Sequence, residues 1–311
     1  MKKLIVLLLV AVLVMSLAAC AKQPQPTQGS EPAQDSKPTE NSEPTQATED
    51  TKETAPAENL LERADFGTYD GEIISKVTVL QNLRNDGDFG VAQGACTDGK
   101  YIYIILENQK VEAEGGYSKN PHYSKIFKID PATMETVQVS EPLLIDHGND
   151  ITYNSKTGLL VVSHNSPNRK YLSTVDPETL ELVETLKDNE LDMYAIAYNA
   201  TKDKYVIGIS HGYDFAIADG QLNIEQRFEG KVTNWTKQGV ECDDDYIYFL
   251  QYNSNAIVVY DWDGNYIRTI RVIWMNNEPE DIFLLDGKFY MTSYIGAKSG
   301  AQIFEMRFIG M

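Results

Sequence analysis

Short apolar runs, rich in β-branched and aromatic residues, alternate with clusters of Asp, Asn, Gly and Pro over most of the chain. The stretch 238–260, QGVECDDDYIYFLQYNSNAIVVY, shows the unit: an apolar run, an acidic turn, a second run, a polar turn and a third run. Runs of this length between turn residues are typical of buried antiparallel strands. The pattern therefore predicts consecutive strands joined by tight turns.

This unit recurs five times, most visibly in the second run, which begins at Tyr101, Leu159, Tyr205, Tyr246 and Phe289. The starts lie 58, 46, 41 and 43 residues apart, and a Gly-rich, charged insertion at 110–122 lengthens the first interval. A period of about 40–45 residues with four strands per unit is the signature of a β-propeller. A β-sandwich would not explain five aligned units.

The fifth unit reaches the last residue, Met311, after three runs, and the strand predicted at 72–80 belongs to no unit around it. That strand can supply the missing fourth one and so leave no open edge between the first and last blades. We therefore predict an all-β protein whose residues 59–311 form a five-bladed β-propeller, with the ring closed by the strand at 72–80.

The first twenty residues have a different character. Lys2 and Lys3 precede an apolar stretch at 4–17 that is too short to span a bilayer, which indicates a signal peptide over residues 1–19. Leu17-Ala18-Ala19-Cys20 resembles the lipobox of bacterial lipoproteins. The resemblance implies cleavage before Cys20, acylation of that residue with chains such as palmitate, and a lipid anchor on the extracytoplasmic face of the cell membrane.

Residues 20–58 differ again, with six of the twelve prolines among Gln, Ser, Thr and Glu and no aromatic residue. Such a segment cannot bury enough apolar surface to offset its ordering entropy, so we expect a disordered tether.

Charge narrows the range of partners. Without Lys2 and Lys3 the chain has 25 basic and 46 acidic residues, a net charge near −21. This argues against nucleic acid and anionic membrane surfaces as partners, because phosphate binding requires clustered Lys and Arg. Membrane lipid attached through Cys20, small molecules, glycans and peptides stay open. Cys96 and Cys242 fall in inner strands of non-adjacent units, so we expect buried free thiols, and we expect a monomer.

The turns and two dipeptides carry a family resemblance. Asp130-Pro131-Ala132-Thr133 and Asp176-Pro177-Glu178-Thr179 follow third runs, and Gln93-Gly94 and Gln238-Gly239 enter first runs. The repeats resemble five-bladed propellers of the plant-type glutaminyl cyclase class and the DPxT-turn propellers of bacterial surfaces. The Gln-Gly pairs match a motif of those cyclases. Glu241, however, is followed by Cys242 and does not match their Glu-Gly motif, so the resemblance implies the fold more than the activity.

A propeller brings residues that precede strand 1 and residues that follow strand 2 to one face of the ring. The residues on this face that we predict to bind a ligand are His147, Asn149, Asp150, His164, Asn165, His211, Trp235, Tyr252, Trp274, Glu280 and Tyr294. Their aromatic rings suit sugar rings or peptide side chains, and their polar groups would orient the ligand. Glu241, Asp281 and His147 are candidate catalytic residues. Asp150, Glu241 and Asp281 are oxygen ligands suited to calcium.

Three functions remain open on these grounds. The first is a binding protein for an envelope glycan, oligosaccharide or peptide. The second is a metal- or carboxylate-dependent enzyme of cyclotransferase, hydrolase, lactonase or lyase type, and the third is a protein-interaction scaffold. For any single acid or histidine, a structural role in satisfying backbone groups or channel water is the competing interpretation.

Overall fold

The computed structural model describes residues 89–108, 122–186, 191–210, 214–229, 237–252, 256–273, 278–294 and 301–308, together with the backbone of 71–80. Contacts divide the chain into two units, Met1–Thr54 and Ala55–Met311, and every described residue lies in the second. The segments predicted to be a signal peptide and a tether, with Cys20 between them, lie outside the described residues. No helix within the described ranges is long and apolar enough to cross a membrane.

The described residues form twenty strands in five blades, each antiparallel within itself. Blade 1 contains β2 (Phe89–Thr97), β3 (Ile102–Asn108), β4 (Ser124–Asp130) and β5 (Glu135–Val139). Blade 2 contains β6 (Asp150–Asn154), β7 (Leu159–Ser163), β8 (Leu172–Val175) and β9 (Leu182–Leu186). Blade 3 contains β10 (Met193–Asn199), β11 (Lys204–Ile209), β12 (Asp214–Asp219) and β13 (Ile224–Glu229).

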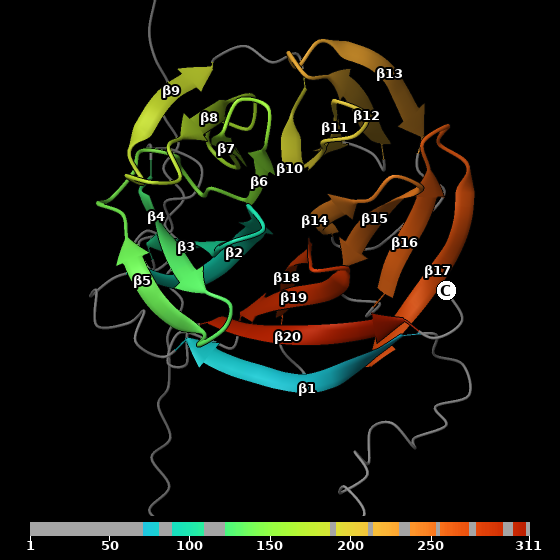
Figure 1. Ribbon diagram of the computed structural model, residues 1–311. Coiled ribbons are helices and arrows are strands. Elements are labelled where there is room, and N and C mark those ends of the chain that lie inside the picture. Colours follow the sequence, from blue (N-terminus) through green and yellow to red (C-terminus); the bar gives the residue numbers. More distant parts are fainter. Residues whose placement is uncertain are drawn as a thin grey trace, which may run out of the picture. The chain divides into compact units, whose positions relative to one another are not determined.

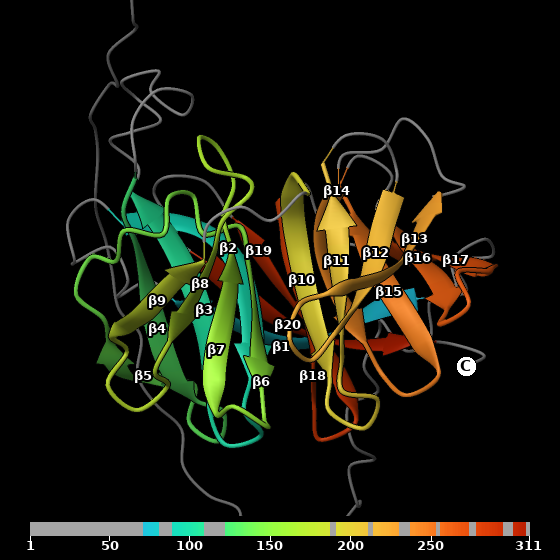
Figure 2. The same ribbon diagram turned by 90° about the horizontal axis from the view of Figure 1, so that it is seen from above.

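Blade 4 contains β14 (Lys237–Cys242), β15 (Tyr246–Gln251), β16 (Ala256–Asp261) and β17 (Tyr266–Ile273). Blade 5 contains β18 (Glu278–Leu285), β19 (Lys288–Tyr294), β20 (Ala301–Phe308) and, as its outer strand, β1 (Gly71–Leu80). Figure 1 looks down the ring, with the first strand of each blade innermost, and Figure 2 shows the sheets from the side. The predicted five-bladed propeller is confirmed.

The ring is closed by the N-terminal strand, as predicted. β1 pairs antiparallel with β20 from Gly71↔Phe308 to Leu80↔Ala301, and the two lie side by side in Figure 1. β1 also pairs in parallel with β17, through Gly71↔Val272 and Glu72↔Ile273, so it joins the outer edges of blades 4 and 5. Residues more than 200 positions apart thus hold the last blade in the ring.

The core is divided among the interfaces between blades. Between blades 5 and 1, Ile102, Ile104 and Phe127 pack against Phe283 and Ile303. Similar clusters fill the junctions of blades 1 and 2, 2 and 3, 3 and 4, and 4 and 5. Burying each face of a sheet against the next blade is the main source of stability in this fold. Cys96 and Cys242 are free and buried in this core, as predicted.

Acidic residues shape the turns at the end of the ring where strands 1 and 2 are joined. Asp98 and Asp243 begin the same motif, D-x-x-Y-I-Y, in blades 1 and 4. One carboxylate oxygen of Asp98 accepts the backbone N–H groups of Lys100 and Tyr101, and the other accepts the Tyr103 hydroxyl at 2.8 Å. Asp243 makes the equivalent bonds. The run Asp243-Asp244-Asp245 is therefore a structural turn, as we expected.

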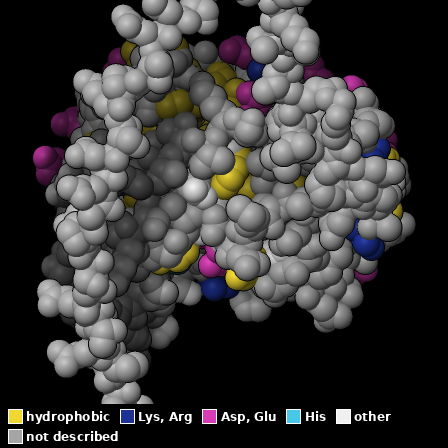
Figure 3. Space-filling view, turned by 90° about the horizontal axis from the view of Figure 1, so that it is seen from below, with side chains coloured by type: hydrophobic (Ala, Val, Ile, Leu, Met, Phe, Trp, Pro, Cys, Tyr) yellow, Lys and Arg dark blue, Asp and Glu magenta, His cyan; other side chains and the backbone are white. Residues whose placement is uncertain are grey.

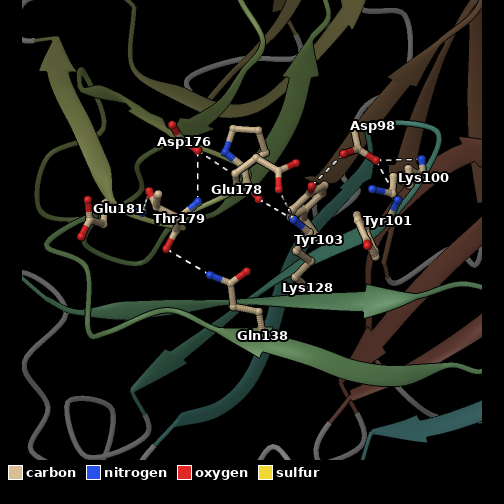
Figure 4. A network of polar contacts seen from close by, with 11 residues as sticks. Asp98, Lys100, Tyr101, Tyr103, Lys128, Gln138, Asp176, Glu178, Thr179 and Glu181 are labelled. Carbon is tan, nitrogen blue, oxygen red and sulfur yellow. Dashed lines mark hydrogen bonds and ion pairs between the residues drawn. The ribbon is translucent and has the colours of Figure 1, made fainter.

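A buried lysine ties blade 1 to blade 2 on the same side (Figure 4). Lys128 on β4 is 4% exposed, and its ammonium group donates a 2.9 Å hydrogen bond to the carbonyl of Pro177. The ammonium lies 4.4 Å from the centre of the Tyr101 ring and 3.6 Å from the carboxylate of Glu178. Because the Glu178 side chain is 75% exposed, the carbonyl and the ring stabilise the cation more than the ion pair does.

The outer strands carry most of the exposed apolar side chains, among them Val137 on β5 and Val183 on β9. On the side drawn in Figure 3, the described apolar, acidic and basic side chains are intermingled. Scattered apolar residues of this kind are normal on a protein surface.

Candidate functional site: the channel and its polar mouth

Strand pairing places the start of strand 1 beside the end of strand 2 in every blade. Asp150 pairs with Ser163, Lys237 with Gln251, and Glu278 with Tyr294. The face predicted from the sequence therefore exists, and its centre is the end of the channel lined by the five inner strands. We call this region the mouth.

Below the mouth, two aspartates from different blades meet across the ring. Asp150 of blade 2 and Asp281 of blade 5 are 0% and 1% exposed, and their carboxyl groups are hydrogen-bonded to each other. Two carboxyl groups in such contact must share a proton, because a pair of adjacent negative charges in a buried site is strongly unfavourable. Neither side chain comes from an element adjacent in sequence to the other.

The carboxyl pair accepts one backbone N–H from every blade. Asp281 accepts the N–H groups of Ala95 at 2.7 Å and Ile282 at 2.8 Å. Asp150 accepts those of Ile151 at 2.8 Å, Ile196 at 2.9 Å and Val240 at 3.3 Å. These five donors occupy equivalent positions, since each pairs with the equivalent residue of its own second strand. The pair is therefore the hub that joins all five blades at the axis.

Local irregularities turn these N–H groups toward the axis. The register of strand 1 shifts just before the donor in blades 1, 3 and 4, and just before Asp281 in blade 5. Such β-bulges bend a strand and leave a residue outside the regular ladder. The bulges therefore explain how an inner strand can direct a backbone donor to the channel while staying paired with strand 2.

Two glycines make room for the hub. A Cβ atom on Gly239 would lie 1.7 Å from a carboxylate oxygen of Asp281, and one on Gly94 would lie 2.4 Å from the Cα atom of Asp150. Both distances are far below any contact that real Cβ atoms make. The Gln-Gly pairs at 93–94 and 238–239 are thus explained by packing around the two aspartates.

Glu241 forms a second tie deeper in the channel. Its carboxylate accepts the N–H of Cys242 at 2.8 Å and that of Leu284 in blade 5 at 2.9 Å. At the equivalent position of blade 2, the hydroxyl of Thr152 accepts the N–H of Tyr198 and joins blade 2 to blade 3. The channel acids therefore serve the backbone of neighbouring blades.

Burial controls the protonation of these acids. It raises the pKa of Asp150 to about 7, against the opposing effect of hydrogen bonds from Asp281 and the backbone. Burial, reinforced by the neighbouring Asp150 carboxyl, raises the pKa of Asp281 well above its usual range. Burial also raises the pKa of Glu241 to about 8, although two backbone N–H groups favour its charged form. The hub therefore keeps its proton at neutral pH.

The floor of the mouth has one residue from each blade; four have polar side chains, and the fifth, Tyr194, packs in the core between blades 3 and 4. Each lies two residues before one of the axial N–H donors, and the five residues are Gln93, Asn149, Tyr194, Gln238 and Glu280. A second polar residue per blade lies at the end of strand 2, and this set is Glu107, Asn165, Ser210, Tyr252 and Tyr294. The donor positions themselves are all apolar, so polarity rises sharply at the mouth.

Several mouth residues are held by one another. The Nδ1 atom of His147 lies 2.9 Å from a carboxylate oxygen of Glu107, whose side chain is fully buried. Asn165 donates to the amide oxygen of Asn149 at 2.6 Å, and Asn149 in turn donates to the carbonyl of Tyr194. Such networks fix side chains in one orientation, which is what specific recognition of a ligand requires.

Glu280 is different from its neighbours. It is 6% exposed, and within the described residues it makes no hydrogen bond. Burial and then the carboxylates of Glu278 and Glu107 raise the pKa of Glu280 well above its usual range. Gln238 donates to Glu278 at 3.1 Å, so Glu278 is engaged where Glu280 is not. Asp150, Asp281 and Glu241 stabilise the fold by accepting backbone N–H groups, whereas Glu280 accepts none within the described residues.

His164 belongs to a buried network that has the order of a catalytic triad. Its Nδ1 atom lies 2.6 Å from Asp146 and its Nε2 atom 2.8 Å from the hydroxyl of Ser173, which also contacts Thr185 at 2.9 Å. Asp146, His164 and Ser173 are between 0% and 2% exposed. A nucleophile must reach its substrate, so this network supports a structural role. His164 was predicted to bind a ligand, and this burial gives that prediction no support.

The predicted residues other than His164 fall into three groups. At the mouth are His147, Asn149, Asn165, Tyr252, Glu280 and Tyr294. In the channel are Asp150, Glu241 and Asp281. Outside the described residues are His211, Trp235 and Trp274. The structure adds Lys237, whose ammonium donates to the carbonyl of Ile209 and lies over the Tyr194 ring, and Gln251, its strand partner. A residue-by-residue alignment of the second strands would have placed both at the mouth.

The three predicted calcium ligands, Asp150, Glu241 and Asp281, each accept backbone N–H groups. Within the described residues, no three of His, Cys, Asp and Glu group in a way that could hold a metal ion. The carboxyls of Asp150 and Asp281 are surrounded by N–H donors, whose positive ends favour an anion at this position. Calcium needs free carboxylate or carbonyl oxygens. Calcium binding at these three residues therefore stays a prediction without support from this geometry.

Comparisons with known proteins support the fold. No family model and no curated protein matches the chain. Among solved structures, glutaminyl cyclase of Myxococcus xanthus is similar over 76% of this chain and 95% of its own, with 14% sequence identity and a TM-score of 0.54. A streptogramin B lyase is similar over 71% of this chain and 65% of its own, with 14% identity and a TM-score of 0.41. At 14% identity, the similarity to the glutaminyl cyclase shows a shared propeller fold and nothing more.

Proposed function

We propose that the chain is a binding protein whose propeller mouth recognises a glycan, oligosaccharide or peptide, and that Cys20 anchors it to the extracytoplasmic face of the membrane. The observation that supports the binding role most is the set of polar residues that the blades contribute above the hub, at the floor positions and at the ends of the second strands. Several of these side chains are held in one orientation by hydrogen bonds to one another. Sites with a few fixed polar groups are typical of ligand binding.

The contrast between the channel and the mouth argues against a purely structural role for the mouth. Channel acids each accept at least two backbone N–H groups, so their place in the fold is explained. At the mouth, Glu280 makes no hydrogen bond within the described residues, and the amide oxygen of Gln251 is enclosed without a partner. Leaving the enclosed oxygen of Gln251 without a partner costs about 1–3 kcal/mol, and a ligand or water would recover part of this.

The test is a direct binding screen with the full chain in detergent against soluble envelope oligosaccharides and peptides, followed by titration calorimetry of each hit. Asn165→Ala should weaken the binding of a hit about tenfold, because it removes one side of the Asn149 network. Glu178→Ala, an exposed change in the turn between β8 and β9, is the matched control and should leave affinity unchanged. Hits that bind both variants equally would place binding elsewhere on the protein.

The membrane anchor has a separate test. Acylation at Cys20 predicts a mature chain whose first residue is a lipid-modified cysteine, which intact-mass spectrometry of the membrane fraction detects. Cys20→Ala should move the protein out of that fraction, and retention of the variant in the membrane would contradict the anchor.

An enzyme is the second candidate, and the state of Glu280 favours it. A buried carboxyl that keeps its proton, beside Glu278, is the arrangement expected of a general acid near a carboxylate. Asp281 and Glu241, the acids we first considered for catalysis, are instead committed to backbone N–H groups. Turnover of any bound ligand, lost in Glu280→Gln while binding persists, would support this alternative.

A further inference from the structure

The part of the mouth between blades 5 and 1 gathers carboxyl groups with a single imidazole beside them. Glu280 and Glu278 come from β18, and Glu107 comes from the end of β3. The charges that act on Glu280 are those of the other two glutamates, and both oppose its ionisation. Basic groups nearby are committed elsewhere: His147 contacts Glu107, and Lys237 donates to the carbonyl of Ile209.

Packing does not explain why an acid occupies position 280. The equivalent positions in blades 1, 2 and 4 carry neutral amides, Gln93, Asn149 and Gln238, and blade 3 carries Tyr194. A neutral amide would fill the same space and would need no bound proton to stay neutral beside Glu278 and Glu107. Glu280 is only 6% exposed to solvent and has no hydrogen bond within the described residues. An acid that is this buried and has no hydrogen bond among the described residues is suited to a partner that arrives from outside.

A metal ion is the poorer choice of partner, because the described acids, histidines and cysteines include no group of three that could hold one. An ammonium group needs only one close carboxylate and one or two further acceptors, which Glu280, Glu278 and the floor amides can supply. We infer that the side of the mouth between blades 5 and 1 is a subsite for a primary ammonium group of the ligand, with Glu280 as its counter-ion. The inference rests on the proposed function, whose ligand it narrows to one that carries a free amine.

Binding of the ammonium would change the protonation of the site. In the free protein Glu280 keeps its proton, because burial and two carboxylates raise its pKa well above the usual range. An ammonium group beside it favours the carboxylate, so the proton leaves Glu280 for the buffer as the ion pair forms. No such release is expected when the amine of the ligand is acetylated.

The experiment compares matched pairs of ligands by titration calorimetry at neutral pH with the full chain in detergent. One pair is the trimer of glucosamine and the trimer of N-acetylglucosamine, and the other is a lysine tripeptide with free and with acetylated amines. We expect the free-amine member of at least one pair to bind about tenfold tighter or more. It should also release a proton, seen as a dependence of the heat on the ionisation enthalpy of the buffer. The pair that responds identifies the source of the amine.

Two variants complete the test. Glu280→Gln should remove both the preference and the proton release, with the thermal midpoint of unfolding unchanged or higher, since a neutral amide replaces a neutral acid. Glu135→Gln, exposed on β5, is the control and should bind as the unaltered chain does. Equal affinity for both members of each pair, or a preference that survives in Glu280→Gln, would overturn the amine subsite and leave the proposed function standing. Failure of all four ligands to bind would count against both.

Discussion

Removing one carboxyl of the hub should destabilise the whole ring. Asp281→Ala deletes the acceptor of the Ala95 and Ile282 N–H groups and the hydrogen bond to Asp150. Each buried group left without a partner costs about 1–3 kcal/mol, and water entering the space would recover part of it. We therefore expect the free energy of unfolding to fall by about 3–5 kcal/mol. Asp150→Ala leaves three N–H groups without acceptors and should cost at least as much.

The double variant is the sharper measurement. Each single change already removes the shared hydrogen bond between the two carboxyls, so the double variant loses that bond only once. Its destabilisation should fall short of the sum of the single changes by at least about 1 kcal/mol. Urea unfolding followed by far-UV circular dichroism and tryptophan fluorescence would give all three values.

Asp130→Ala is a suitable control, because Asp130 accepts a single N–H in an exposed turn between β4 and β5. It should cost no more than about 1 kcal/mol. Single changes at the hub that cost no more than this control, with additive effects in the double variant, would show that the hub does not couple the blades.

Three further outcomes follow from the geometry. Because burial raises the pKa of Glu241 to about 8 and an unfolded Glu titrates near its ordinary value, the native state holds more protons between about pH 4 and 8. Stability should therefore fall as pH rises through this window, by up to about 1.4 kcal/mol per unit, and urea unfolding of Glu241→Gln should show a shallower slope. Lys128→Ala should lower the free energy of unfolding by about 2–4 kcal/mol in the same assay, because it removes the contacts with the Pro177 carbonyl and the Tyr101 ring. The control is Lys100→Ala, an exposed lysine over the same Tyr101 ring, which should change stability by less than about 0.5 kcal/mol. Equal effects of the two changes would show that the buried contacts of Lys128 do not stabilise the protein. Ser173, fully buried, should resist a fluorophosphonate probe in the folded protein, and labelling detected by mass spectrometry would reopen the catalytic interpretation.

The two Gln-Gly pairs belong both to the resemblance to glutaminyl cyclases and to the packing of the hub. The Gln-Gly pairs that carry part of it are explained here by the space that Asp150 and Asp281 require, which is a property of the hub. Gln93 and Gln238 do lie in the floor ring, so the same dipeptides serve both the fold and the mouth. A shared dipeptide at the entrance of a blade therefore supports a shared architecture and leaves the activity to be tested.

The position of individual side chains in the ring could be predicted only in part. The sequence placed Asp150, Glu241 and Asp281 together on the mouth face, whereas the structure places them below it, bound to backbone N–H groups. The reason is the β-bulges in the inner strands, because one extra residue changes which groups turn toward the axis. A bulge leaves no mark in the pattern of apolar residues. Glu280, one residue before Asp281, stays at the mouth and has a different environment.

Taken by itself, the sequence determined the architecture of this protein, because five repeats of short apolar runs can bury their faces only by packing against one another in a ring. It also determined that the strand at 72–80 completes the last blade, since the fifth repeat lacks its fourth strand. Only the tertiary structure decided which acids serve the fold and which face a ligand. That distinction depends on whether a carboxyl meets backbone N–H groups of other blades, and such contacts join residues up to 186 positions apart.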